Sequence, residues 1–262
     1  NKTRRRSNIY SIVKMDFLQP DIVLPFTVIL AVVAFLYASV GHGGASGYLA
    51  LMALFSFPVF VMKPTALLLN IFVSGISFWF FKKNNHFNWK LFYPFAITSI
   101  PMAFVGGYIS VDATVYKQIL GIFLAIAILR MLNILGQKET QLKPSNLWIS
   151  LAIGSAIGLF SGMIGIGGGI ILSPIIILLG WGNMKQAAAV SALFIFVNSI
   201  SGIIGFVVKG NSIPMEAWYF IPAAIIGGSI GALYGSQKFN MQTLKYVLAS
   251  VLAMASVKLF FI

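Results

Sequence analysis

Ten apolar runs, separated by short polar breaks, account for most of this 262-residue chain. Several of them reach the ~20 residues that a helix needs to cross a bilayer. Hydrophobic residues make up 59% of the chain and charged residues only 9%, too few to cover a surface that faces water. The sequence therefore predicts an all-α polytopic membrane protein with about eight full transmembrane helices plus short or re-entrant ones. The runs lie at 21–40, 45–62, 64–81, 91–111, 115–135, 147–164, 168–180, 187–208, 214–234 and 242–262.

Length and composition also restrict the class of function. Ten segments of ~20 residues would use roughly 200 residues, which leaves no room for a soluble catalytic or ATP-binding domain. The net charge of +13 would suit nucleic acid, but the basic residues are scattered between apolar runs, so we expect lipid head groups as their partner. With no cysteine, two separated histidines and no carboxylate in mid-run, the sequence predicts no metal site, no cofactor and no enzyme.

A polar linker at 136–146 divides the chain into two membrane repeats, predicted at 16–135 and 147–262. Residues 1–15 form a basic N-terminal tail. Because Met15 could itself be an initiator, whether the residues before it are native stays open.

The two halves share three markers in the same order. Gly41-x-Gly-Gly matches Gly165-x-Gly-Gly at a shift of 124 residues, and Pro101-x4-Gly-Gly matches Pro222-x4-Gly-Gly at a shift of 121. A third match, near the end of each half, has a shift of 128 residues. Such nearly constant shifts predict an internal duplication. Five segments per half is an odd number, which favours an inverted repeat, unless only one arm of each short hairpin spans.

Glycine clusters introduce the second and seventh runs and are the main candidates for a binding site. Irregular backbone at membrane depth is tolerated only where it is buried in protein or lines a cavity. A helix that begins after such a cluster directs free N–H groups and its positive dipole end at that cavity, which favours an anion. Inverted symmetry would bring both clusters together near the midplane. Close helix packing by small residues is the alternative. The candidates are Gly41, His42, Gly43, Gly44, Gly165, Gly167, Gly168 and Gly169.

Polar residues on the apolar runs that follow supply further candidates. Asn70 shares one helical face with two serines, and Ser191 and Asn198 lie seven residues apart. These side chains either contact a substrate or hold helices together by hydrogen bonds.

Lys63 and Lys185 stand at corresponding entrances to the same helices. They either attract an anion to a vestibule or anchor the helices at the membrane interface. His42 has no counterpart in the second half, where Ile166 takes its place, so the site cannot require two histidines.

In a cysteine-free chain of this length, the two clusters resemble those of the sulfite exporter TauE/SafE family of membrane permeases. The second-half pattern, with Pro174 five residues after Gly169, is the more specific; in the first half Ala45 and Ala50 replace its last glycine and its proline. The resemblance implies a permease for small sulfur-containing anions, such as sulfite or organosulfonates, in the bacterial cytoplasmic membrane. An anion channel, an uptake permease for another small oxyanion or carboxylate, and a non-transporting scaffold are the alternatives.

The direction of transport is inferred from energetics and not from the resemblance. An anion that leaves a negative-inside cell gains about 2.3 kcal/mol per charge per 100 mV, so export would need no coupling ion. The expected partners are a small anionic substrate and the lipid bilayer. Homo-oligomerisation and membrane orientation stay open.

Overall fold

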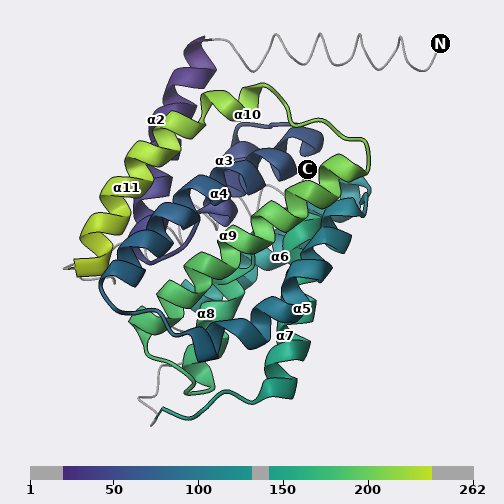
Figure 1. The fold of residues 1–262 in the computed structure, drawn as a ribbon. Coiled ribbons are helices and arrows are strands. Elements are labelled where there is room, and N and C mark those ends of the chain that lie inside the picture. Colours follow the sequence, from purple (N-terminus) through teal and green to yellow (C-terminus); the bar gives the residue numbers. More distant parts are fainter. Residues whose placement is uncertain (1–19, 132–141, 238–262) are drawn as a thin grey trace.

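The computed structural model describes residues 20–131 and 142–237. The tail predicted at 1–15, most of the linker and the last apolar run lie outside these residues. The described parts fold into helices joined by short loops (Figure 1). The helices are α2 (Pro20–Ser39), α3 (Ala45–Leu54), α4 (Val59–Lys83), α5 (Trp89–Tyr108), α6 (Ala113–Met131), α7 (Leu147–Ile164), α8 (Gly169–Leu178), α9 (Met184–Val208), α10 (Glu216–Tyr219) and α11 (Ile221–Gln237).

Six of these helices are long and apolar enough to cross a membrane: α2, α4, α5, α7, α9 and the stretch from α10 through α11. The helices α3 and α8 have only 10 residues each, as the two short runs predicted. The predicted number of about eight full spans is not confirmed within the described residues. Of the other two runs, 115–135 coincides with α6, which is not among the six, and 242–262 is not described.

The boundary between the second and third runs was predicted wrongly. The runs 45–62 and 64–81 place the break at Lys63, but α4 already begins at Val59, and Pro64 lies inside its second turn. A proline this early removes a single intrahelical hydrogen bond, so the helix tolerates it. The break falls instead at 55–58, and Lys63 lies within α4 rather than at its entrance.

The first helix of each half packs against a helix of the other half: α2 against α11, and α7 against α5. In Figure 1, α2 and α11 lie side by side at one edge, while α5 and α7 lie together at the opposite edge. Gly227, Gly231 and Gly235 of α11 lie against the backbone of α2 at successive turns, at Ala31, Phe35 and Ser39.

The same arrangement recurs between α5 and α7. Gly154, Gly158 and Gly162 of α7 lie against the α5 backbone at Phe95, Ser99 and Ala103. In both pairs the residue numbers rise together, so the paired helices run parallel. Small residues allow this close approach of backbones in a membrane protein, where dispersion contacts replace the hydrophobic drive.

The corresponding helices α4 and α9 cross the centre and run antiparallel. Near the start of α4, the Lys63 Nζ lies 5.6 Å from the ring centroid of Phe206 near the end of α9. At the other end of α4, Phe81 packs with Ala188 and Ala189 near the start of α9. Two helices of equal length, one from each half, thus have opposite directions, and both glycine clusters lie against this pair.

Candidate functional site

The two glycine clusters meet beside the middle of α4 and α9. Gly43 of the first cluster and Gly167 of the second both lie against the side chains of Asn70 and Ile195. Asn70 is the twelfth of 25 residues in α4, and Ile195 is the twelfth of 25 in α9. The two clusters therefore approach each other beside the middle residues of α4 and α9.

Asn70 connects the two clusters through its side-chain amide. Its Oδ1 accepts a hydrogen bond from the Ala45 amide (3.0 Å), the first N–H of α3. Its Nδ2 donates to the Ile166 carbonyl and to Ser199 Oγ, both at 3.4 Å. Because Asn70 is fully buried, losing any of these bonds would leave a polar group without a partner.

Both short helices begin at a glycine in the left-handed region and point their N-termini at this meeting point. The N-cap of α3 is Gly44 (φ 95°), and that of α8 is Gly168 (φ 79°); neither N-cap residue has a side chain that could cap its own helix. Glycine adopts this conformation without the cost that a Cβ imposes. Within the described chain, the amides of Gly167, Gly168 and Gly169 have no hydrogen-bond partner. The second N-terminus thus keeps donors available, whereas Asn70 occupies the first donor of α3.

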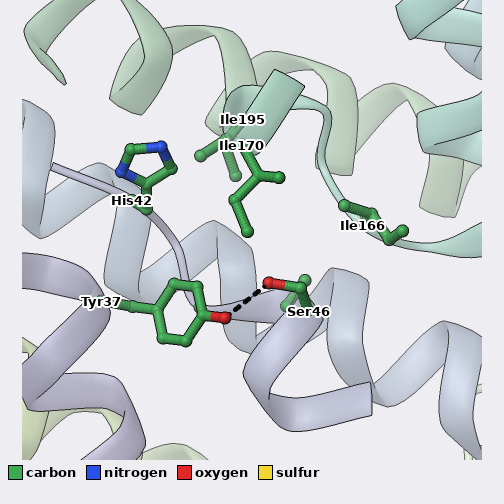
Figure 2. Close-up of a pocket in the computed structure, with 8 residues that line it drawn as sticks. Tyr37, His42, Ser46, Ile166, Ile170 and Ile195 are labelled. Atoms are coloured by element: carbon green, nitrogen blue, oxygen red, sulfur yellow. Dashed lines mark hydrogen bonds between the residues drawn. The ribbon is translucent and has the colours of Figure 1, made fainter. Parts of the chain in front are cut away.

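A small enclosed cavity lies between the two N-termini (Figure 2). The space in which the centre of a water molecule fits is about 10 Å³, so the cavity holds about one water molecule. Figure 2 shows Tyr37, His42 and Ser46 of the first half facing three isoleucines of the second half. Ser46 Oγ donates to Tyr37 Oη at 2.8 Å. The lining residues are Tyr37, His42, Gly44, Ala45, Ser46, Ile166, Ile170 and Ile195.

His42 joins the first cluster to α8 and α9 of the second half. Its Nδ1 donates to the Val40 carbonyl (2.9 Å), and its Nε2 forms a hydrogen bond with Ser173 Oγ at 3.3 Å. Ser173 Oγ in turn lies 2.7 Å from Ser191 Oγ. This hydrogen-bonded chain places two of the predicted candidates, His42 and Ser191, together.

Asn198 is also fully buried, but neither its Oδ1 nor its Nδ2 has a hydrogen-bond partner. Its neighbours along α9 contact the second cluster: Ile195 and Ser199 lie against Gly167, and Phe194 lies against Gly168. Burying an unpartnered amide is costly, and such groups often mark a place where water or a ligand binds.

A second and much larger cavity, of about 590 Å³, lies at the end of the molecule where α4 begins and α5 and α9 end. Lys63 and Lys117 both line it, and its exposed lining residues Phe60, Ser110 and Asn211 open it to the surface. We call this cavity the vestibule. Its floor adjoins the second glycine cluster, because Gly165 lies against Lys63.

Lys63 is buried in the vestibule wall and holds the end of α5. Its Nζ donates to the carbonyls of Gly106 (3.2 Å), Gly107 (3.0 Å) and Ile109 (3.5 Å). A cation is favoured there by the negative end of the helix dipole. Lys63 is therefore neither a snorkelling anchor nor a freely exposed receptor for anions.

The predicted correspondence between Lys63 and Lys185 is wrong. Lys185 is exposed and is only the second residue of α9, whereas Lys63 is the fifth residue of α4. The residue of α9 that corresponds to Lys63 by position is Ala188.

Sequence reasoning missed Tyr37, Ser46, Ser173 and Ser199. The signal for Ser173 was present, because it is the only polar side chain in α8. Tyr37 and Ser46 flank the first cluster, but only the turn of the chain at 40–44 shows that their hydroxyls meet.

Comparison of the sequence with known proteins identifies its family. The chain matches the family model described as sulfite exporter TauE/SafE over residues 26–259. It belongs to the TauE/SafE family. The family resemblance that the glycine clusters indicated is thereby confirmed.

Relatives of this TauE/SafE protein are named as transporters. The probable membrane transporter protein y4hK of Sinorhizobium fredii is 37% identical over 232 residues, which cover 87% of this chain and 94% of that protein. The probable membrane transporter protein MJ0441 of Methanocaldococcus jannaschii is 26% identical over 265 residues, covering 92% and 96%. No solved structure matches the chain. Family and helices together establish a multi-pass membrane protein of a transporter family.

Proposed function

We propose that this protein carries small sulfur-containing anions, such as sulfite or organosulfonates, out of the cell across the cytoplasmic membrane. The observation that supports this best is the meeting of two glycine-capped helix N-termini at an enclosed cavity between the halves. Unpaired N–H groups and aligned peptide dipoles bind an oxyanion without a buried lysine. The substrate-binding set comprises the predicted glycines with His42, Asn70, Ser191 and Asn198.

The halves form an inverted repeat under this proposal, and the vestibule gives the substrate access from one face. The antiparallel directions of α4 and α9 support the inversion. Beyond the vestibule, the central cavity has room for only about one water molecule, so the conformation is occluded. A carrier needs such an occluded site, whereas an open channel does not, and this favours a carrier over an anion channel.

Export follows from the membrane potential. An anion that leaves a negative-inside cell moves down its electrical gradient by about 2.3 kcal/mol per charge per 100 mV. In the described membrane-spanning segments, Asp and Glu occur only near the helix ends, at Asp21 and Glu216, so we propose no carboxylate relay for a coupling ion.

Sulfite efflux from proteoliposomes under an imposed potential tests the proposal. Wild type is compared with Gly167→Val, because a Cβ at Gly167 would lie 2.5 Å from Asn70 Nδ2 and 2.7 Å from the Ile195 Cγ2 atom. Gly210→Val is the matched control: Gly210 also has a positive φ (92°), but nothing lies within 4 Å of its Cβ position.

We expect saturable, potential-driven efflux in wild type and in Gly210→Val, and its loss in folded Gly167→Val. Flux that rises linearly with concentration would indicate a channel. Normal transport by Gly167→Val would show that the glycines serve helix packing alone.

A further inference from the structure

We propose that the central cavity is matched to a single negative charge, so that the protein carries monoanions and rejects dianions of the same shape. This inference rests on the proposed function and specifies its substrate class. It separates sulfonates and hydrogen sulfite from sulfate and the fully deprotonated sulfite dianion.

The first step is the charge that the protein presents to the cavity. A helix N-terminus acts as roughly +0.5 elementary charge, so the N-termini of α3 and α8 together supply about +1. Both helices have 10 residues and reach the cavity wall with their first turns: Ala45, the first residue of α3, and Ile170, the second residue of α8, line the cavity. This partial charge is fixed in the backbone and balances one negative charge.

The second step is that no ionised side chain adds to this sum. None of the eight lining residues is Asp, Glu, Lys or Arg. Under this proposal the His42 imidazole is neutral, with Nδ1 donating to the Val40 carbonyl and Nε2 accepting from the Ser173 hydroxyl, 3.3 Å away. The nearby cation, Lys63, lines the vestibule, and its charge is directed to three carbonyls at the end of α5.

The third step is an independent sign of a ligand, namely neutral donors that lack partners. Tyr48 is fully buried, its hydroxyl has no hydrogen-bond partner, and the oxygen lies 2.6 Å from the Cβ position of the cavity residue Gly44. The Asn198 amide beside the second cluster is equally buried and unpartnered. Hydroxyl and amide donors bind the oxygens of an anion but cannot neutralise a second charge.

A dianion in this site would keep one charge uncompensated in a water-poor environment, which proteins avoid. Methanesulfonate and sulfate are suitable probes, because both are tetrahedral and differ in one methyl group against one charged oxygen. We expect wild-type protein in proteoliposomes to transport methanesulfonate at least about 100-fold faster than sulfate at equal concentration. The charge moved per methanesulfonate, obtained from the reversal potential, should be one.

A charge-adding variant provides the complementary test. Ile195→Lys places a cation on the cavity wall and should raise the sulfate-to-methanesulfonate ratio at least about tenfold, whereas Ile195→Met should leave the ratio unchanged. If Ile195→Lys does not fold, the charge per substrate in wild type decides instead.

Equal transport of sulfate and methanesulfonate, or a charge of two per substrate, would overturn the single-charge proposal and leave anion transport standing. An unchanged ratio in folded Ile195→Lys would also overturn it. If neither sulfite nor methanesulfonate is transported, the proposed function itself fails.

Discussion

The two glycine clusters contact corresponding positions of α9 and α4, but their neighbours differ. Gly41 of the first cluster packs on Ala188, and Gly165 of the second packs on Lys63. Ala188 is the fifth residue of α9, and Lys63 is the fifth residue of α4. At Ala188 the contact is close and belongs to a buried cluster with Phe81, whereas at Lys63 it borders the vestibule.

This difference shows how two similar glycine clusters can be packed closely in one place and border a cavity in the other, although the helices that they contact have the same length. A small residue at the fifth position lets α9 close on the first cluster. A long, hydrogen-bonded lysine at the same position keeps the wall of α4 polar. Side chains, rather than the backbone plan, distinguish the two faces.

The largest expected effect compares the two cluster glycines directly. Gly41→Ala would bring a Cβ within 2.6 Å of the Ala188 Cβ at positive φ, whereas a Cβ at Gly165 would approach the Lys63 carbonyl oxygen only to 3.0 Å. We expect Gly41→Ala to lower the free energy of unfolding by more than about 3 kcal/mol and Gly165→Ala by about 1–2 kcal/mol. Thermal unfolding in detergent measures both.

Gly210→Ala isolates the cost of positive φ in this comparison, because its Cβ would meet nothing within 4 Å. Adding Ala188→Gly to Gly41→Ala should restore part of the stability. If Gly165→Ala proved the more damaging change, the two faces would not differ in tightness as described.

The next effect compares the two central asparagines. Asn70→Ala removes three hydrogen bonds between the clusters and should destabilise the protein by about 2–4 kcal/mol. Asn198→Ala removes an amide without partners, so its stability should stay within about 0.5 kcal/mol of wild type or rise. Under the proposed role of Asn198 in binding, its half-saturating sulfite concentration should still rise about tenfold. A stable Asn198→Ala with unchanged transport would remove Asn198 from the site.

A smaller effect separates the two lysines. Lys63→Met leaves the carbonyls at the end of α5 without their cation and should cost about 1–2 kcal/mol while raising the half-saturating sulfite concentration. Lys185→Met, at an exposed position, should change stability by less than about 0.5 kcal/mol and leave transport unchanged. Unfolding curves and flux titrations of both variants test this, and equal effects would contradict the structural difference between the two sites.

The smallest effect concerns His86, in the loop between α4 and α5 at the end opposite the vestibule. Partial burial and the nearby charge of Lys185 lower the pKa of His86 below its ordinary value of 6.5. The unfolded chain therefore takes up this proton first, so stability should fall slightly as the pH drops through about 6.5 and level off below the lowered pKa. His86→Gln should abolish this component of the pH dependence, and Lys185→Gln should weaken it; a steeper loss in either variant would contradict the assignment.

Sequence reasoning predicted much of this fold because its signals were local. Run length and glycine position predicted the all-α class and the two short helices that follow the glycine clusters. The break predicted between the second and third runs, at Lys63, was wrong because α4 includes this lysine, whose ammonium group is hydrogen-bonded to carbonyls at the end of α5. Nothing in the sequence singles out Tyr48, because it is one residue of an apolar run. Only the three-dimensional structure shows that its buried hydroxyl has no hydrogen-bond partner.

The predicted correspondence of the two lysines was wrong for a similar reason. Spacing alone put Lys63 and Lys185 at corresponding helix entrances, whereas α4 begins earlier than the apolar pattern indicated, which shifts Lys63 into the helix. Long-range contacts such as Lys63 to the end of α5 join residues more than 40 positions apart, beyond any periodic pattern.

The packing of α2 against α11 sets an order of events during synthesis. α2 ends at Ser39, and the helix whose glycines lie against its backbone, α11, begins only at Ile221. At ~5–20 residues per second the ribosome needs on the order of 10–40 s to cover that interval. Throughout it, the newly inserted α2 waits in the lipid without its partner, so a chain cut between the halves should need both fragments made together to assemble.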